Sequence, residues 1–277
     1  MIKADYHVHS CFSGDSEERP ENIIKYAMNH GLDTLCFTDH MDYEYRYEPE
    51  GMFEIDVPKY FEHLFQLKEQ YAGKFNVRIG IELGLRDEPD LLESVREQNR
   101  ALVTEYPFDF VIGSTHQMVH VDPYYPEFWE NRSQREGMEM YFISGLENIK
   151  NNEFFDSYGH LDYLIRYANG DKTQYNCSDY AELIEPMLKE LIARGKALEI
   201  NSKGLTPSYG INAPHPGREV LRRYRELGGE LITVGSDAHT ADGVAVYFDQ
   251  VETMLKDIGF RYYAIFENRK PQMRKFD

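Results

Sequence analysis

Apolar positions follow two different periods along the chain, one typical of buried strands and one typical of amphipathic helices. Short apolar runs alternate with longer segments whose apolar residues recur every three or four positions. Strands are expected at residues 2–8, 35–37, 77–81, 108–112, 156–158, 197–200, 231–234 and 262–266. Two long loops, at about 40–55 and through Tyr124, Tyr125 and Trp129, interrupt this alternation.

The longer segments carry helix signals at their ends. Pro20 and Gly31 bracket the first, which fits the preference for proline at helix starts and glycine just past helix ends. Asp56 and Ser178 are candidate caps, and Pro186 predicts a kink or break in the helix after Ser178. The helices are expected between Pro20 and Gly31, after Asp56, at 89–104, at 133–150, after Ser178, at 217–228 and at 242–256.

Strict alternation of strand and helix favours a parallel sheet with helices outside it. The 277 residues suit one α/β barrel, a fold of about 250 residues, and 42% hydrophobic residues can fill its core. No change in composition marks a second domain. The sequence therefore predicts a closed or nearly closed barrel of about seven units, with residues 1–277 forming a single domain.

Charge and cysteine content narrow the choice of partners and location. A formal net charge of −18 disfavours nucleic acid, because contacts with phosphates need a basic surface. The sequence contains no run of about 18 apolar residues, so no membrane span is predicted. No charged-then-apolar leader is seen, so export is not expected. Three unpaired cysteines suit a reducing cytoplasm better than a disulfide framework. The sequence does not indicate an oligomeric state.

The polar residues that follow the predicted strands point to metal chemistry. His7 and His9 are two apart on a strand, so both imidazoles face the same side and can reach one ion. A single histidine after a strand is more often a hydrogen-bonded loop residue, but strand ends converge at the mouth of a β/α barrel, where their side chains meet. The set after the other strands is Asp15, His40, Glu82, His116, His160, Asp237 and His239.

These residues carry a family resemblance. The segments His7-Val8-His9, Thr38-Asp39-His40 and Gly235-Ser236-Asp237-Ala238-His239, in this order, resemble the motifs of the polymerase and histidinol phosphatase (PHP) superfamily over residues 5 to about 240. Finer features resemble its histidinol-phosphate phosphatase branch, and the family fold is a distorted (β/α)7 barrel. These features are Cys11-Phe12-Ser13-Gly14-Asp15-Ser16, Asp39-His40-Met41-Asp42-Tyr43, and Gly159-His160-Leu161-Asp162-Tyr163 followed by Arg166-Tyr167.

The resemblance implies three divalent metal ions, with zinc, manganese and iron all open as identities. Asp15 stands where other branches often have a histidine, which puts the third site most in doubt. By motif, the first ion would be held by His7, His9, Glu82 and Asp237, the second by Glu82, His116 and His160, and the third by Asp15, His40 and His239.

The resemblance also implies roles in phosphoester hydrolysis. Water between two divalent ions loses a proton near neutral pH, and the resulting hydroxide would attack phosphorus. Glu82 would bridge two ions, and Asp237 or His239, or a metal-bound water, would protonate the leaving alkoxide. Three divalent ions would make the site locally cationic in an acidic protein. The candidates for substrate binding are Arg166 and Lys203 for phosphate, and Glu17, Asp42, Tyr43 and Asp162 for an amine or ring.

The function implied is hydrolysis of L-histidinol phosphate to L-histidinol and phosphate, a step of histidine biosynthesis. One alternative is another PHP-type phosphoesterase that acts on nucleotides or other small phosphomonoesters. A second is a metal-stabilised binding or scaffold module without turnover, which the nearly complete ligand set disfavours.

Overall fold

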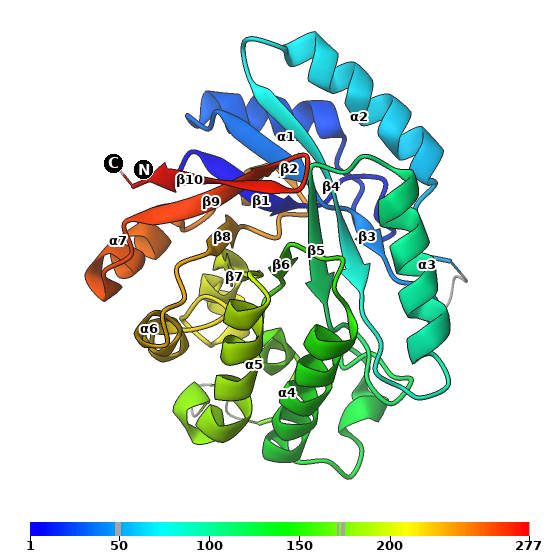
Figure 1. Cartoon of the computed structure of the whole chain (residues 1–277), viewed down its shortest axis with the longest axis vertical. Helices are drawn as coiled ribbons and strands as arrows, with labels where there is room; N and C mark the ends of the chain where they lie inside the picture. The colour runs from blue at the N-terminus through cyan, green and yellow to red at the C-terminus, as the bar shows by residue number, and fades with distance from the viewer. Residues whose placement is uncertain (48–50, 171, 173–174, 277) are drawn as a thin grey trace.

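The computed structural model describes residues 1–47, 51–170, 172 and 175–276. Seven parallel strands form its centre in the order β1, β2, β4, β5, β6, β7 and β8, and helices surround them (Figure 1). A two-residue strand, β3 (His40–Met41), continues along β4 beyond β2. The parallel strands are β1 (Ala4–Val8), β2 (Thr34–Phe37), β4 (Asn76–Gly84), β5 (Phe110–Ser114), β6 (Ser157–Tyr158), β7 (Ala197–Asn201) and β8 (Ile232–Gly235). The predicted seven-unit α/β barrel is confirmed.

The helices bury the apolar stripes that predicted them. Asp56 caps α2 by accepting a hydrogen bond from the Lys59 backbone, and Ser133 and Glu136 form a capping box at the start of α4. None of the helices in the described part of the chain is long and apolar enough to cross a membrane. The helices are α1 (Pro20–Asn29), α2 (Val57–Tyr71), α3 (Leu92–Glu105), α4 (Gln134–Asn151), α5 (Ala181–Ala193), α6 (Arg218–Glu226) and α7 (Phe248–Ile258).

Two helix predictions were wrong in detail. Helix α5 continues through Pro186 without a break, because its apolar residues are buried on both sides of the proline, and Ser178 lies in a preceding 3-10 turn that Asn176 caps. The last helix begins at Phe248 instead of residue 242. Its start is delayed because Ala245 and Tyr247 adopt left-handed backbone angles, with φ of 56° and 63°, which a continuous helix does not allow. The predicted loop at 40–55 includes residues 48–50, which lie outside the described residues.

The barrel closes where its first and last strands meet. Beyond the end of β8, the Asp237 amide donates to the His7 carbonyl at 2.8 Å, and the His9 amide donates to the Ala238 carbonyl at 2.8 Å. Val8 and Ala238 form a parallel bridge between these bonds. The closure therefore lies at the carboxyl ends of the strands and uses the backbone of predicted metal ligands.

A hairpin covers the amino end of the barrel. The basic segment after β9 (Tyr262–Glu267), for which no strand was predicted, forms β10 (Lys270–Lys275), antiparallel to β9. Asn268 and Arg269 make the turn with φ of 49° and 63°, and this tight turn lacks the usual glycine signal. Phe266 lies 4.9 Å from Phe110 between ring centres, and its carbonyl accepts a hydrogen bond from the buried Tyr6 hydroxyl.

We expect Phe266→Ala to lower the free energy of unfolding by about 3–5 kcal/mol, because it removes a buried ring from the amino end of the barrel. Chemical denaturation measures this change. Met273→Ala in β10 is the control, since Met273 is 47% exposed and should change stability by less than about 0.5 kcal/mol. Equal effects of the two substitutions would contradict a packed role for the hairpin.

Candidate active site

The carboxyl ends of the strands surround a cavity of about 460 Å³. The predicted metal ligands His7 and His9 are completely buried beside Glu82. Arg166 and Lys203 also line the cavity. The predicted metal ligands that line it are Asp15, His40, Glu82, His116, His160, Asp237 and His239.

Glu82 lies at the centre of this group, on β4. Its Oε2 atom lies 3.0 Å from His7 Nε2 and 3.4 Å from His9 Nε2. Its Oε1 atom lies 3.2 Å from His116 Nε2 and 3.0 Å from His160 Nε2. Burial alone would raise the pKa of Glu82, but the imidazoles, His7 foremost, hold that pKa well below its usual value. His40 Nδ1 also lies 3.3 Å from Oε2, so Glu82 is an ionised carboxylate whose two oxygens face different sets of histidines.

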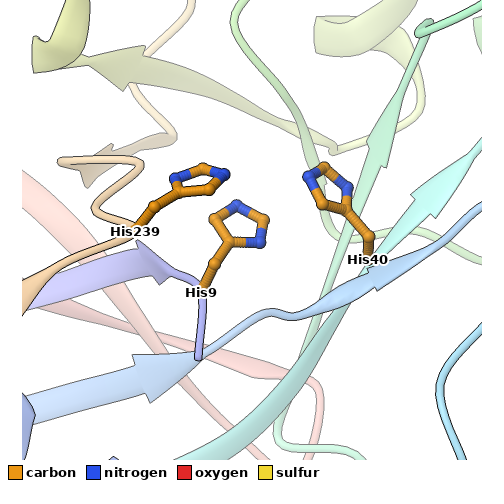
Figure 2. A group of neighbouring side chains, drawn as sticks. All are labelled: His9, His40 and His239. Carbon is orange, nitrogen blue, oxygen red and sulfur yellow. The ribbon is translucent and has the colours of Figure 1, made fainter. Parts of the chain in front are cut away.

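A second group of ligands lies next to the first. Figure 2 shows the rings of His9, His40 and His239 approaching one another from three separate segments of the chain. The ring centres of His40 and His239 each lie 4.3 Å from that of His9. Asp15 Oδ2 lies 2.8 Å from His239 Nε2 and 3.7 Å from His40 Nε2. The loop after β1 thus brings a carboxylate to these imidazoles.

Asp237 has an unusual backbone conformation that directs its side chain into the site. Its φ of 55° is left-handed, a region that aspartate tolerates better than most residues. Its Oδ2 accepts a hydrogen bond from Arg166 at 2.9 Å, and its Oδ1 accepts one from Lys203 at 3.2 Å. Burial would raise the pKa of Asp237, but these two cations, Lys203 foremost, keep it well below its usual value.

Comparison with known proteins identifies the family. The sequence profile of the PHP domain matches residues 5–203, which is more than half of the chain. The chain belongs to the PHP domain family.

Full-length relatives of this PHP domain are known. It is 32% identical to the histidinol-phosphatase of Lactococcus lactis over 276 residues, which cover 99% of this chain and 98% of the relative. The crystal structure of the Lactococcus lactis histidinol phosphate phosphatase, complexed with zinc, L-histidinol and phosphate, matches with a TM-score of 0.87 at 31% identity over 98% of each chain. A Listeria monocytogenes structure matches with a TM-score of 0.73 at 19% identity over 90% of this chain and 99% of its own, which supports the fold alone.

The donor atoms of the PHP domain suit divalent metal ions. His7 Nε2 and His9 Nε2 lie 3.1 Å apart in a completely buried position. Two facing ring nitrogens can share one proton in a single hydrogen bond, whereas a metal cation can accept a lone pair from each nitrogen. Imidazole and carboxylate are the ligands that zinc, manganese and iron take in proteins. Among the described residues, donor atoms within 4.8 Å of one another occur in four groups, which are His9 with His40 and His239, His7 with His9 and Glu82, His40 with Asp42 and His116, and Glu82 with His116 and His160.

Outer hydrogen bonds fix the orientation of these imidazoles. His7 Nδ1 donates to Glu199 Oε1 at 2.5 Å, and His116 Nδ1 donates to Asp42 Oδ1 at 2.7 Å. Such bonds hold the opposite ring nitrogen as a lone-pair donor to metal. Glu199 was not predicted to support the site, although an acidic residue inside the apolar strand β7 (Ala197–Asn201) is a recognisable signal. Asp42 was predicted to bind substrate, and it lies against His116 as well as in the cavity lining.

The remaining substrate-binding candidates lie outside the lining of the cavity. Glu17 is exposed on the loop after β1. Tyr43 is half-buried and packs against the hydrophobic core. Asp162 is buried and accepts hydrogen bonds from His215 Nδ1 at 2.7 Å and the Tyr175 hydroxyl at 2.9 Å. The cavity lining also includes residues that the sequence analysis did not select, among them Tyr45, Phe53, Asp122, Tyr163 and Tyr167.

We expect Glu199→Gln to weaken metal binding by about 10- to 100-fold. Glu199 Oε2 also accepts from the His160 backbone amide at 2.6 Å, so the glutamine must place its NH2 group against one of two N–H donors. Competition with a chromophoric chelator measures the affinity. Glu252→Gln is the control, because Glu252 is a buried acid on α7 away from the cavity. Unchanged zinc affinity in Glu199→Gln would show that the outer carboxylate does not support the site.

Proposed function

We propose that this PHP domain is a metal-dependent phosphomonoesterase that hydrolyses L-histidinol phosphate to L-histidinol and phosphate, a step of histidine biosynthesis. The observation that carries the proposal is the cavity of about 460 Å³, in which imidazoles, carboxylates and two cationic side chains converge. Its volume suits a small ligand. The full-length similarity to a phosphatase crystallised with zinc, L-histidinol and phosphate supports the choice of substrate.

We propose that this site holds three divalent ions. Zinc is a candidate for them, because the Lactococcus lactis structure contains zinc. Bound ions of this kind act as Lewis acids towards phosphate oxygens and lower the pKa of water. Asp15, His40 and His239 would hold the third ion, and their partial exposure suits the most easily exchanged position. The first would be held by His7, His9, Glu82 and Asp237, and the second by Glu82, His116 and His160.

Arg166 and Lys203 are proposed to position the phosphate group. The Arg166 guanidinium is buried, donates to Asp237 and to Asn201 Oδ1, and has an Nε that lacks a hydrogen-bond partner among the described residues. Lys203 Nζ lies 3.0 Å from His239 Nδ1. Both cations thus contact groups at the metal site, where a phosphate oxygen would meet them. We assign proton transfer to the leaving alkoxide to His239, which lines the cavity, because Arg166 and Lys203 keep the Asp237 carboxylate ionised.

The location and domain organisation are also proposed. A reducing cytoplasm suits three free cysteines, one of which, Cys11, is exposed. The whole chain is proposed to act as one domain, because the hairpin of β9 and β10 packs against the amino end of the barrel.

Purified zinc-loaded protein should release phosphate from L-histidinol phosphate with a kcat/KM at least about 100-fold higher than for nucleotides and sugar phosphates. The reason is that a site whose polar groups pair with those of its own substrate discriminates against other substrates by several kcal/mol. Phosphate-release assays on a substrate panel measure this. His160→Ala should abolish release, and His63→Ala, which alters an ion pair between α2 and Glu21 outside the cavity, should not. Efficient hydrolysis of another monoester without release from L-histidinol phosphate would overturn the assignment, and unchanged release in His160→Ala would favour the scaffold alternative.

Arg166→Lys should reduce kcat/KM by about 10- to 100-fold with zinc content unchanged, because lysine keeps the charge and loses the planar fork that matches phosphate oxygens. Steady-state kinetics and elemental analysis of the same preparation separate the two effects. Arg78→Lys is the matched control, since Arg78 pairs with Glu267 near the amino end of the barrel. A variant with full activity would exclude Arg166 from phosphate binding.

A further inference from the structure

One stretch of the cavity lining is made of tyrosines and a single carboxylate. Tyr45 comes from the loop after β3, and Asp122, Tyr124 and Tyr125 come from the loop after β5. The Asp122 Oδ2 atom accepts a hydrogen bond from the Tyr45 hydroxyl at 2.9 Å, and its Oδ1 accepts one from the Tyr124 backbone amide at 2.8 Å. Both oxygens of Asp122 are therefore fixed by neutral donors.

Asp122 differs from the other carboxylates that line the cavity. Those four contact imidazole, guanidinium or ammonium groups, whereas within the described residues Asp122 is bonded only to a phenol and a backbone amide. A carboxylate has about four lone-pair sites, so Asp122 keeps capacity for another donor. The four paired carboxylates are Asp15, Asp42, Glu82 and Asp237.

The two loops that carry this group are tied together. The Tyr47 ring stacks on Tyr125 with 3.7 Å between ring centres, and the Tyr47 hydroxyl donates to Glu127 at 2.6 Å. Arg46 donates to the His120 carbonyl. These contacts hold Tyr45 and Asp122 in place without a ligand, which lowers the ordering cost of binding one.

We propose that Asp122 binds the cationic end of the substrate, an alkylammonium or imidazolium group, and that the Tyr45 hydroxyl positions this carboxylate. The inference rests on the proposed function and adds to it the residue that recognises the organic part of the substrate. Burial raises the pKa of Asp122, and its two hydrogen bonds come from neutral donors, so a cation bound there gains a partly desolvated counter-ion. Neighbouring Tyr124 and Tyr125 add aromatic faces, which also attract cations.

The substrate therefore meets two chemically distinct parts of the cavity. Arg166 and Lys203, with the metal ligands, suit the phosphate, while Asp122 and its tyrosines suit the amine or ring. A neutral phosphomonoester would use the first part alone. Removing the Asp122 charge should therefore change discrimination between charged and neutral substrates and leave phosphate chemistry intact.

The test compares Asp122→Asn on L-histidinol phosphate and on p-nitrophenyl phosphate, which lacks a cation. We expect KM for L-histidinol phosphate to rise about 10- to 100-fold, the size of a charged hydrogen bond, with kcat and the zinc content unchanged. The kcat/KM for p-nitrophenyl phosphate should stay within about twofold. L-Histidinol should inhibit p-nitrophenyl phosphate hydrolysis about 10- to 100-fold less strongly than in the wild type. Equal loss on both substrates, or no change on either, would overturn the proposal.

Two tyrosine variants provide a matched pair. Tyr45→Phe removes the hydroxyl that holds Asp122 and should raise KM for L-histidinol phosphate selectively, though less than Asp122→Asn. Tyr224→Phe removes a hydrogen bond to the Leu231 carbonyl, outside the cavity lining, and should leave both substrates unaffected. Equal behaviour of the two tyrosine variants would contradict the positioning role.

The choice of substrate separates a failure of this inference from a failure of the proposed function. A wild-type protein that hydrolyses p-nitrophenyl phosphate but not L-histidinol phosphate would refute the proposed function. Phosphoethanolamine, a small phosphomonoester with an ammonium group, would then take the place of L-histidinol phosphate in the same comparison. A selective loss on phosphoethanolamine in Asp122→Asn would support the cation site, and its absence would refute that site too.

Discussion

The Glu82 carboxylate is the interaction on which the rest of the site depends. An ionised carboxylate that is completely buried is costly unless every lone pair has a partner. Five imidazoles within 3.4 Å, together with the Ser114 hydroxyl at 2.6 Å, supply these partners. The same geometry orients each ring towards a common centre, so the charge that must be compensated also arranges the groups that bind metal. The surrounding carboxylates act one step further out, because Glu199 and Asp42 fix the far nitrogens of His7 and His116.

The strongly acidic composition and an anionic substrate are compatible because charge is distributed unevenly. The formal net charge is −18, yet Arg166 and Lys203 both lie in the cavity and both donate to Asp237. The ligand carboxylates that line the cavity are each paired with imidazoles or cations. Field strength at a site depends on the nearest groups and on bound ions far more than on the net charge of the molecule.

Much of this arrangement could be predicted from the sequence, since it depends on the periodicity of apolar residues and on the position of polar residues after each strand. The spacing of His7 and His9 places both on one face of β1, and the polar residues after the other strands meet because parallel strands end together. The parts that could not be predicted depend on contacts between distant segments. Asp122 lies in a long loop with no periodicity, and only the fold brings Tyr45 to it. The hairpin turn at Asn268 and Arg269 lacks glycine, so β10 had no recognisable signal in the sequence. A kink or a break was predicted at Pro186, and the break does not occur because burial of the apolar residues on both sides of the proline keeps α5 continuous.

The position of the barrel closure has a consequence for the order in which the molecule assembles. The backbone bonds from His7 to Asp237 and from His9 to Ala238 join segments separated by almost the whole length of the chain. Contacts of such high sequence separation carry the largest loop-closure entropy and form after local ones. A chain synthesised only as far as β7 therefore lacks the site, because the first ligands, His7 and His9, need the segment after β8. A metal ion held by both His9 and Asp237 would cross-link the first and last strands of the barrel and so reinforce the closure that the backbone bonds make.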